Sequence, residues 1–268
     1  MHAAIGKTQT ITDRLDPARA VAMHATLGLP GPAPGSDDPL PLFWHHIYFW
    51  DPQPPANLGR DTHPKTGIGL IPELGLPQRM WAGGALDFHA PLRIGASAEK
   101  TTTVESVTEK TGRSGRLGFV TLRHDIRQNG VLCVIERQDI VYRDPPNLHA
   151  ATAPHMARTD EAEARSASFD TTLLFRYSAL TFNGHRIHYD LDYCQRVEGY
   201  RGLVVHGPLL AQLLIGLADE KIGGLSTFQF RATSALMHDE VAEICAGQDG
   251  ALWVRGPDGR QCMIASAS

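Results

Sequence analysis

The chain has 268 residues, which is enough to bury a substantial core as one large domain or two smaller ones. Its formal net charge of −4 gives no electrostatic reason to bind nucleic acid or an anionic membrane, and we expect neither as a partner. No apolar run approaches the length of a membrane span, and residues 1–7 lack the apolar core of a secretory signal. The four widely spaced cysteines form no C-x-x-C pair, which favours free thiols and a cytoplasmic location. The thirteen histidines show no metal-ligand spacing, so we expect no metal.

The first half begins with a predicted helix and a predicted buried strand. Residues 10–27 look helical, with Asp16-Pro17 as a plausible N-cap and first helical residue. Leu42–Trp50 (LFWHHIYFW) is dense in aromatic and apolar residues, which fits a buried strand, and we interpret His45 and His46 within it as structural. Residues 51–79 form a long segment rich in proline and glycine, which favours a loop that covers a ligand.

Four further strands are expected to form an antiparallel meander in this half. They are rich in β-branched and alternating residues, and glycine marks the turns between them. Asn129-Gly130, between the last two, is the strongest short hairpin signal known. A helix followed by such a meander predicts an α+β fold. The predicted strands span residues 81–88, 98–110, 117–128 and 131–142.

The second half repeats this order more compactly. Residues 147–170 are alanine-rich, charged and without apolar periodicity, so we interpret them as a linker. The matching order of helix and strands indicates an internal duplication with low residue identity, and the predicted domains are residues 1–146 and 171–268. The helix is predicted over residues 207–220, followed by strands at residues 224–236, 240–248, 251–256 and 261–266.

Residues 183–190 concentrate reactive polar side chains more densely than any other stretch. Asn183 and His188 are five residues apart, and Gly184 permits a tight turn between them. If a strand ends near Thr181, both side chains face one small space. An imidazole can take a proton from water near neutral pH, and a carboxamide can hold that water without titrating. The pair therefore suits the addition of water to an activated double bond, or its removal.

Such chemistry also needs a donor for the charge that develops on the carbonyl oxygen. Gly207 stands where an apolar pair of residues meets the predicted helix, so its N–H lies near the positive end of the helix dipole. Pro208 at the first helical position removes a donor that would otherwise be unpaired. We therefore predict that the Gly207 N–H binds a thioester oxygen.

The string from Tyr177 to His188 (YSALTFNGHRIH), followed by Val205-His206-Gly207-Pro208, resembles the MaoC-like family of R-specific hydratases and dehydratases. In the common pattern of that family, Gly-Asp-x-Asn-Pro-x-His, the aspartate and the histidine are catalytic. His188 falls on the histidine and Asn183 falls on the aspartate, which is a true departure because an amide cannot be a base. The longer string Phe-Asn-x-His-Arg-Ile-His-Tyr-Asp resembles the subgroup of mesaconyl-C4-CoA (itaconyl-CoA) hydratases and mitochondrial-type hydroxyacyl-thioester dehydratases.

The resemblance implies a double hot-dog fold, in which two antiparallel sheets each wrap a central helix and the first hot dog is degenerate. It also implies a homodimer with one active site per chain, a CoA or acyl-carrier thioester as substrate, and no cofactor. His188 would then shuttle the proton, Asn183 would orient the water and Gly207 would hold the thioester oxygen. Within the subgroup we favour a short branched dicarboxylic enoyl-CoA, such as mesaconyl-C4-CoA or itaconyl-CoA, hydrated to citramalyl-CoA.

A second carboxylate on the acyl group needs a cation, and several arginines lie in segments that can line the site. Arg186 is a candidate for this carboxylate or for a CoA phosphate, although pairing with Asp190 or Asp192 explains it equally well. His206 and Arg231 are also typical of structural or solvated residues. The candidate substrate-binding residues are Arg60, His185, Arg186, His206 and Arg231, and Arg79 also lies in or near a segment that can line the site.

Three other functions remain open from the sequence. A 3-hydroxyacyl-thioester dehydratase of fatty-acid synthesis would need a long apolar tunnel for the acyl chain. A module that binds acyl thioesters without catalysis is the non-enzymatic alternative, because Asn183 removes the usual carboxylate. A thioesterase on the same fold is the third, since a fold does not fix the reaction.

Overall fold

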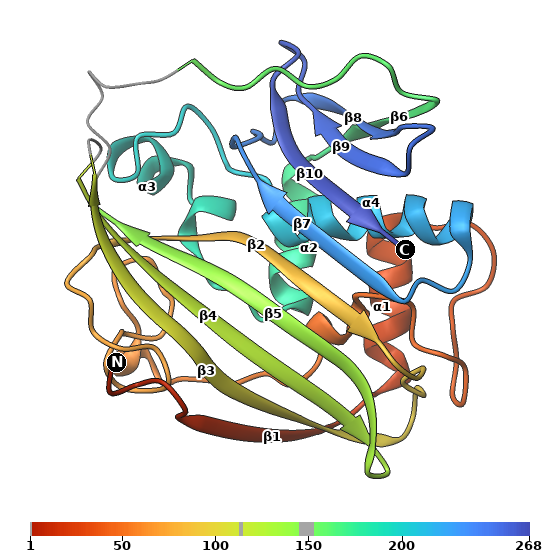
Figure 1. The fold of residues 1–268 in the computed structure, drawn as a ribbon, viewed down its shortest axis with the longest axis horizontal. Helices are drawn as coiled ribbons and strands as arrows, with labels where there is room; N and C mark the ends of the chain where they lie inside the picture. The colour runs from red at the N-terminus through yellow and green to blue at the C-terminus, as the bar shows by residue number, and fades with distance from the viewer. Residues whose placement is uncertain (1, 113–114, 145–152) are drawn as a thin grey trace.

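The computed structural model describes residues 2–112, 115–144 and 153–268, which form a single antiparallel sheet of ten strands (Figure 1). The order across the sheet is β1-β3-β4-β5-β2-β7-β10-β9-β8-β6. The central strands β2 and β7 pair with each other and join the two halves. The strands are Thr8–Arg14 (β1), Gln78–Phe88 (β2), Ser97–Gly112 (β3), Gly115–Gln128 (β4), Val131–Arg143 (β5), Glu163–Ser168 (β6), Thr227–Ala232 (β7), Val241–Ala246 (β8), Ala251–Arg255 (β9) and Gln261–Ala267 (β10).

The strand order is the same in each half when it is followed from the edge of the sheet to its centre. The first half runs β1-β3-β4-β5-β2 and the second runs β6-β8-β9-β10-β7, so every strand of one half has a counterpart in the other. This symmetry agrees with the predicted internal duplication. The strands of the two halves do not form separate layers, because the pairing of β2 with β7 joins them edge to edge into one sheet.

Helix α4 (Gly207–Ile222) is the central helix of the second half and packs against β7, β8, β9 and β10. His206 is its N-cap, and Pro208 lies in the first turn, where its missing N–H leaves no donor unpaired. The predicted helix over residues 207–220 is therefore confirmed. Its side chains that are almost fully buried include Leu209, Leu210, Leu214, Ile215 and Leu217.

The other helices are short and lie on the side of the sheet that carries α4 (Figure 1). Helix α1 (Pro17–Leu27) packs against α2 (Thr171–Leu180), and the Asp16 carboxylate caps α1 by accepting a hydrogen bond from the Ala18 N–H at 2.8 Å. The remaining helical turns are Trp44–Ile47 (η1), Pro55–Asn57 (η2), Arg186–His188 (η4) and helix α3 (Leu191–Arg196).

The apolar run Leu42–Trp50 is buried but does not form the predicted strand. Part of it forms the 3₁₀ helix η1, and Phe43 before it has a φ of 72°. Phe43, Trp44 and Ile47 belong to the main core, which draws apolar side chains from both halves. Periodicity alone does not separate an unbroken apolar strand from a buried helical turn, which explains the error.

The two edge strands fall where other structure was predicted. Strand β1 occupies the first part of residues 10–27, so helix α1 begins only at Pro17. Strand β6 lies inside the predicted linker, so residues 163–168 belong to the sheet and not to a connecting segment. Residues 145–152 of the predicted domain boundary, and residues 113–114 of a predicted turn, lie outside the described residues.

The predicted hairpin between β4 and β5 is confirmed. Asn129 and Gly130 both have positive φ, at 51° and 78°, as a type I′ turn requires. Among the described residues no helix is long and apolar enough to span a membrane. All four cysteines are buried and unpaired, as their spacing predicts.

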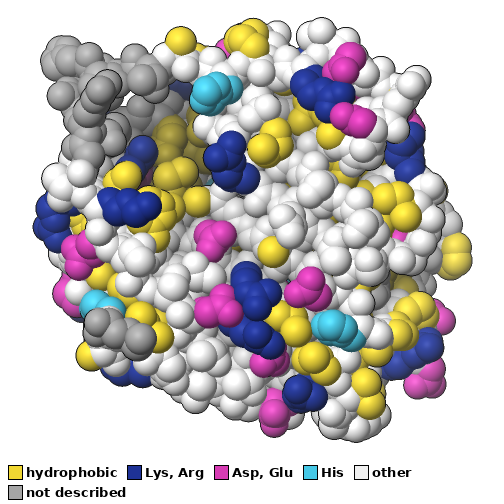
Figure 2. Space-filling view, in the orientation of Figure 1, with side chains coloured by type: hydrophobic (Ala, Val, Ile, Leu, Met, Phe, Trp, Pro, Cys, Tyr) yellow, Lys and Arg dark blue, Asp and Glu magenta, His cyan; other side chains and the backbone are white. Residues whose placement is uncertain are grey.

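Acidic and basic side chains are interspersed over the outer face of the sheet (Figure 2). Arg137 of β5, for example, lies 2.9 Å from Glu105 of β3 and 3.6 Å from Asp87 of β2. Neither sign of charge gathers into a patch on this face. The functional site therefore has to be sought on the side of the sheet that the helices cover.

Candidate active site

Both halves of the chain contribute to a cavity of about 570 Å³, which is a usual volume for a small-molecule site. From the first half come strand β2 and the irregular segments that precede it. From the second half come the loop after α2, the turn η4 and the start of α4. The lining residues used below are His63, Arg79, Trp81, Asn183, His185, His188 and Gly207.

His188 ends the turn η4 with its ring buried beside the cavity. Its Nδ1 lies 2.7 Å from the Val204 carbonyl oxygen. A carbonyl only accepts, so Nδ1 carries the hydrogen and Nε2 keeps its lone pair. Burial lowers the pKa of His188 to about 4, although the bond to Val204 opposes the shift. The ring is therefore neutral at pH 7, with Nε2 available as a base.

His206 lies behind His188 rather than in the cavity. The two rings stack with centroids 3.6 Å apart, and His206 is fully buried. Its Nε2 lies 2.8 Å from the hydroxyl oxygen of Ser178 on α2. The predicted contact of His206 with substrate is therefore wrong, and its ring instead fixes the plane of the His188 imidazole.

Asn183 lies beside the cavity in the loop that follows α2. The segment before it is a helix and not the predicted strand, and Phe182 turns the chain with a φ of 51°. The Asn183 Oδ1 accepts a hydrogen bond from the His185 N–H at 3.1 Å. Its Nδ2 donates to no other described residue, so this amide group is available to a water or a ligand in the cavity.

Gly207 lines the same cavity at the first residue of α4. Its N–H forms no hydrogen bond within the described residues, whereas the N–H groups of Leu209 and Leu210 both donate to the His206 carbonyl oxygen. A free N–H at the start of a helix favours a partial negative charge. This N–H is therefore available to a ligand in the cavity, and its contact with a thioester oxygen stays a prediction.

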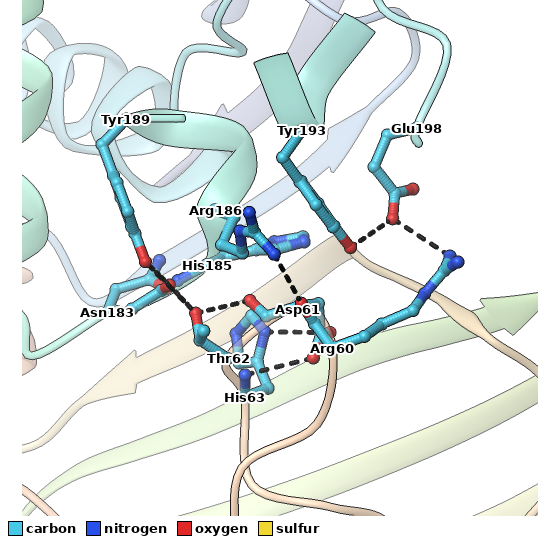
Figure 3. Close-up of polar contacts among 11 residues, drawn as sticks. Arg60, Asp61, Thr62, His63, Asn183, His185, Arg186, Tyr189, Tyr193 and Glu198 are labelled. Atoms are coloured by element: carbon cyan, nitrogen blue, oxygen red, sulfur yellow. Dashed lines mark hydrogen bonds and ion pairs between the residues drawn. The ribbon is translucent and has the colours of Figure 1, made fainter. Parts of the chain in front are cut away.

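A second group of side chains reaches the cavity from the loop before β2 (Figure 3). His63 Nδ1 lies 3.3 Å from an oxygen of Asp61, and its ring centroid lies 4.6 Å from that of His185. The His185 ring is in turn 5.6 Å from that of His188. Burial lowers the pKa of His63 to about 4 and that of His185 to about 2. Burial alone would raise the pKa of Asp61, but its hydrogen bond with His63 helps to hold it at about 2.

Three cations that line the cavity have no carboxylate partner among the described residues. Arg79 and Arg143 come from β2 and β5, and Lys100 comes from β3. None of the three forms an ion pair with a described acidic residue. The Arg143 Nε donates to a neutral side chain, at the Gln78 Oε1 atom, at 3.1 Å. The cavity therefore has cationic groups available for a negatively charged ligand.

The other arginines predicted to bind substrate do not line the cavity. Arg186 pairs with Asp190 at 2.6 Å, and Arg60 pairs with Glu198 at 3.2 Å. Arg231 is exposed on β7. The predicted contact with a carboxylate of the acyl group is therefore wrong for Arg60 and Arg186. The contact of Arg186 or Arg231 with a CoA phosphate at the surface stays a prediction. Of the five substrate-binding candidates, the structure brings only His185 into the cavity, and Arg79, from a segment expected to line the site, lines it as well.

A buried polar cluster occupies another part of the cavity wall. His45 Nε2 and His46 Nε2 lie 2.9 Å and 3.1 Å from the two oxygens of Glu136. Gln138 Nε2 donates to the same carboxylate at 3.1 Å. Burial would raise the pKa of Glu136, but these neighbours hold it well below its usual value. The structural role predicted for the two histidines agrees with these contacts.

Residues 43–238 match the model of the hydroxyacyl-thioester dehydratase type 2 family. The chain belongs to this family. It is 44% identical over 267 residues to a Chloroflexus aurantiacus protein named mesaconyl-C(4)-CoA hydratase, with 98% of this chain and 95% of that protein covered. It is 26% identical over 242 residues to the mitochondrial hydroxyacyl-thioester dehydratase type 2 of Schizosaccharomyces pombe, with 79% of each protein covered.

Solved structures share the fold of this hydroxyacyl-thioester dehydratase family member. HtdX of Mycobacterium tuberculosis aligns with a TM-score of 0.70 at 16% identity, covering 97% of this chain and 99% of that one. Another protein of Mycobacterium tuberculosis, described as a double hotdog fold, aligns with a TM-score of 0.55 at 15% identity, covering 97% and 94%. The double hot-dog fold implied by residues 177–208 is confirmed.

The sequence alone did not identify Asp61, His63, Lys100 and Arg143 as residues of this candidate active site. The one available signal was the length of the irregular segment 51–79, which favoured a loop over a ligand. Residues 62–64 of that segment do line the cavity.

Proposed function

We propose that this chain is a hydro-lyase that adds water to a short branched dicarboxylic enoyl-CoA, such as mesaconyl-C4-CoA or itaconyl-CoA, to give citramalyl-CoA. The observation that carries the proposal is the 44% identity, over nearly the whole chain, to a protein named mesaconyl-C(4)-CoA hydratase. The convergence of a neutral imidazole, an amide and a free backbone N–H on one cavity supports it. We further propose that the enzyme is a cytoplasmic homodimer and uses no cofactor.

Each of the three groups has a distinct part in this reaction. His188 Nε2 takes a proton from water while the water oxygen adds to Cβ of the enoyl thioester. Asn183 orients that water through its amide group. The negative charge that develops on the thioester oxygen is stabilised by the Gly207 N–H and the start of α4. A proton returned to Cα completes the addition.

The cations of the cavity favour a dicarboxylic acyl group. In mesaconyl-C4-CoA the second carboxylate is attached to the carbon that water attacks, so its partner has to lie near the reacting atoms. Arg79 meets this condition because its charge acts on both His63 and His185, which adjoin His188. A guanidinium can bind a carboxylate through two parallel hydrogen bonds. We assign the second carboxylate to Arg79.

A substrate panel tests this function. Purified protein is assayed for hydration of mesaconyl-C4-CoA, itaconyl-CoA, crotonyl-CoA and a longer linear enoyl-CoA, and the hydroxyacyl products are identified by mass. We expect the highest kcat/KM with a dicarboxylic thioester. If crotonyl-CoA or the longer linear thioester were turned over best, the dicarboxylate assignment would be wrong.

The runner-up function is the dehydration of 3-hydroxyacyl thioesters in fatty-acid synthesis. The match to the Schizosaccharomyces pombe dehydratase supports this alternative at lower identity. A long hydrocarbon chain needs apolar walls, and this cavity combines apolar residues such as Phe49, Trp81 and Leu210 with the charged residues Arg79 and Lys100, so the substrate panel decides between the two functions. The same panel also separates the remaining alternatives, because a thioesterase releases free CoA and a binding module leaves every thioester intact.

A further inference from the structure

The loop that carries Asp61 and His63 is fastened to the catalytic motif of the other half (Figure 3). The Arg186 N–H donates to the Asp61 carbonyl oxygen at 3.2 Å, and the Thr62 hydroxyl donates to the Gly184 carbonyl oxygen. The Tyr189 hydroxyl donates to the same Gly184 oxygen at 2.9 Å. The first two bonds span more than a hundred residues of sequence, and they hold Asp61 and His63 beside the catalytic turn.

Four imidazole rings form a row that begins at Asp61. His63 comes first, His185 follows at 4.6 Å between centroids, His188 at 5.6 Å from His185, and His206 stacks on His188 at 3.6 Å. Asp61 is the carboxylate at the start of this row, and it contacts His63 through both of its oxygens. Oδ1 accepts from the His63 N–H at 3.1 Å, and Oδ2 lies 3.3 Å from Nδ1. His63 and His185 line the cavity, whereas His206 does not.

The proposed hydration needs a site for the proton between its removal from water and its delivery to Cα. Asn183 cannot hold a proton, because an amide does not titrate in this range. Protonated His188 is costly in its buried position, since burial penalises the charged form. A carboxylate that neutralises an imidazolium next to it reduces this cost, as an aspartate beside a catalytic histidine does in serine proteases.

We propose that Asp61, acting through His63 and His185, supplies the negative charge that assists proton transfer at His188. Asp61 would thereby replace the aspartate of the family's common pattern, which is Asn183 in this chain. This inference rests on the proposed hydro-lyase function. In the forward direction an O–H bond of water breaks as the C–O bond to Cβ forms, and the proton moves to His188 Nε2. The Asp61 carboxylate, at the start of the imidazole row, offsets part of the positive charge of protonated His188. His188 then delivers this proton to Cα.

Asp61, His63 and His185 also have the spacing of metal ligands, because donor atoms of the three lie within 4.8 Å of one another. Arg79, which lines the same cavity, lowers the pKa of both histidines, so its positive charge opposes a proton on them as well as a metal ion beside them. The EDTA experiment below therefore distinguishes metal binding from proton transfer. The other titratable groups that face Asp61 are Tyr142 of β5 and Tyr193 of α3.

The test compares Asp61→Asn with the double variant Asp61→Asn/Asn183→Asp. The amide introduced by Asp61→Asn retains an oxygen that can accept from the His63 N–H, so the loop is expected to stay in place while the charge is lost. Glu73→Gln is the matched control, since Glu73 is an exposed carboxylate of the same irregular segment and does not line the cavity. Each protein is assayed for kcat, KM and the pH profile of kcat with the best thioester of the panel, and its thermal unfolding midpoint is measured.

We expect Asp61→Asn to lower kcat about a hundredfold or more, with KM and the unfolding midpoint nearly unchanged. Adding Asn183→Asp is expected to recover part of the lost kcat, which a purely structural role of Asp61 does not predict. Glu73→Gln should match the wild type. The proposal is overturned if Asp61→Asn keeps its kcat and pH profile, or if Asn183→Asp recovers nothing. It is also overturned if EDTA abolishes wild-type activity and Zn²⁺ restores it. Absence of turnover with every thioester would refute the hydro-lyase function itself, a result distinct from retained activity in Asp61→Asn.

Discussion

Replacing Arg79 by glutamine should separate binding of the second carboxylate from the rest of catalysis. Arg79 is half-buried, lines the cavity and has no acidic partner among the described residues. A hydrogen bond to a charged group contributes about 1.5–3 kcal/mol. Since 1.4 kcal/mol corresponds to about a factor of ten, Arg79→Gln should lower kcat/KM for mesaconyl-C4-CoA by about 10-fold to 150-fold.

Crotonyl-CoA, which lacks the second carboxylate, is the internal control for this variant. Arg79 also lowers the pKa of His63, and its loss should affect both thioesters alike through that route. Arg79→Lys keeps the charge but not the paired hydrogen bonds, so it should fall between the wild type and Arg79→Gln. Arg123→Gln, on the outer face of β4, controls for the general loss of a positive charge. Equal losses with mesaconyl-C4-CoA and crotonyl-CoA, or no loss with either, would refute the assignment of Arg79 to the second carboxylate.

Three further predictions concern the free energy of unfolding and the role of Arg186. Burial lowers the pKa of His45, His63, His124 and His188 from 6.5 to about 4, so between these values the unfolded chain binds more protons than the folded one. The free energy of unfolding should therefore keep its full contribution from these histidines above pH 6.5. Between pH 6.5 and pH 4 it should fall by about 1.4 kcal/mol per pH unit for each histidine. Urea unfolding at several pH values measures this slope, and a flat profile would contradict the prediction. Glu136→Leu leaves His45 and Gln138 without their acceptor and should cost about 1–3 kcal/mol for each group left unsatisfied, measured by urea unfolding; a total loss below about 1 kcal/mol would show that the cluster is not structural. Arg186→Ala removes an ion pair outside the cavity and should leave kcat within about a factor of two, so a large fall in kcat would place Arg186 in the site after all.

The parts of the site that local sequence signals describe were predictable. Asn183 and His188 lie on one short loop and turn, and Gly207-Pro208 marks the start of a helix by its composition alone. Both features depend on residues close together in the chain. The substitution of asparagine for the family's aspartate was visible in the same stretch, and it pointed to the subgroup that the comparisons support.

The parts that depend on distant contacts were not predictable from one sequence. Asp61 and His63 reach the site only because the loop around them is bonded to Gly184 and Arg186 in the other half. Arg60 was expected to face the ligand, but folding brings it close to Glu198, which is distant in the sequence. The pairing of Arg186 with Asp190, four residues further along the chain, was one of the two outcomes that the sequence left open.

The missed strands have a simpler physical cause. β1 and β6 are the two edges of the sheet, and most of their side chains are exposed. A strand with two exposed faces has no need for alternating apolar residues, so it lacks the period-two pattern by which strands are found. The central strand pairing of β2 with β7 likewise has no local signature, because its partners come from different halves.

The central claim is that His188 is the base of a hydro-lyase, and the kcat of His188→Ala with mesaconyl-C4-CoA tests it most directly. A general base contributes about 10²–10⁴-fold, so kcat should fall by that amount while the protein stays folded. A variant that hydrates mesaconyl-C4-CoA at close to the wild-type rate would contradict the account, because the base would then be another group, such as His63, which also lines the cavity and has its Nδ1 bonded.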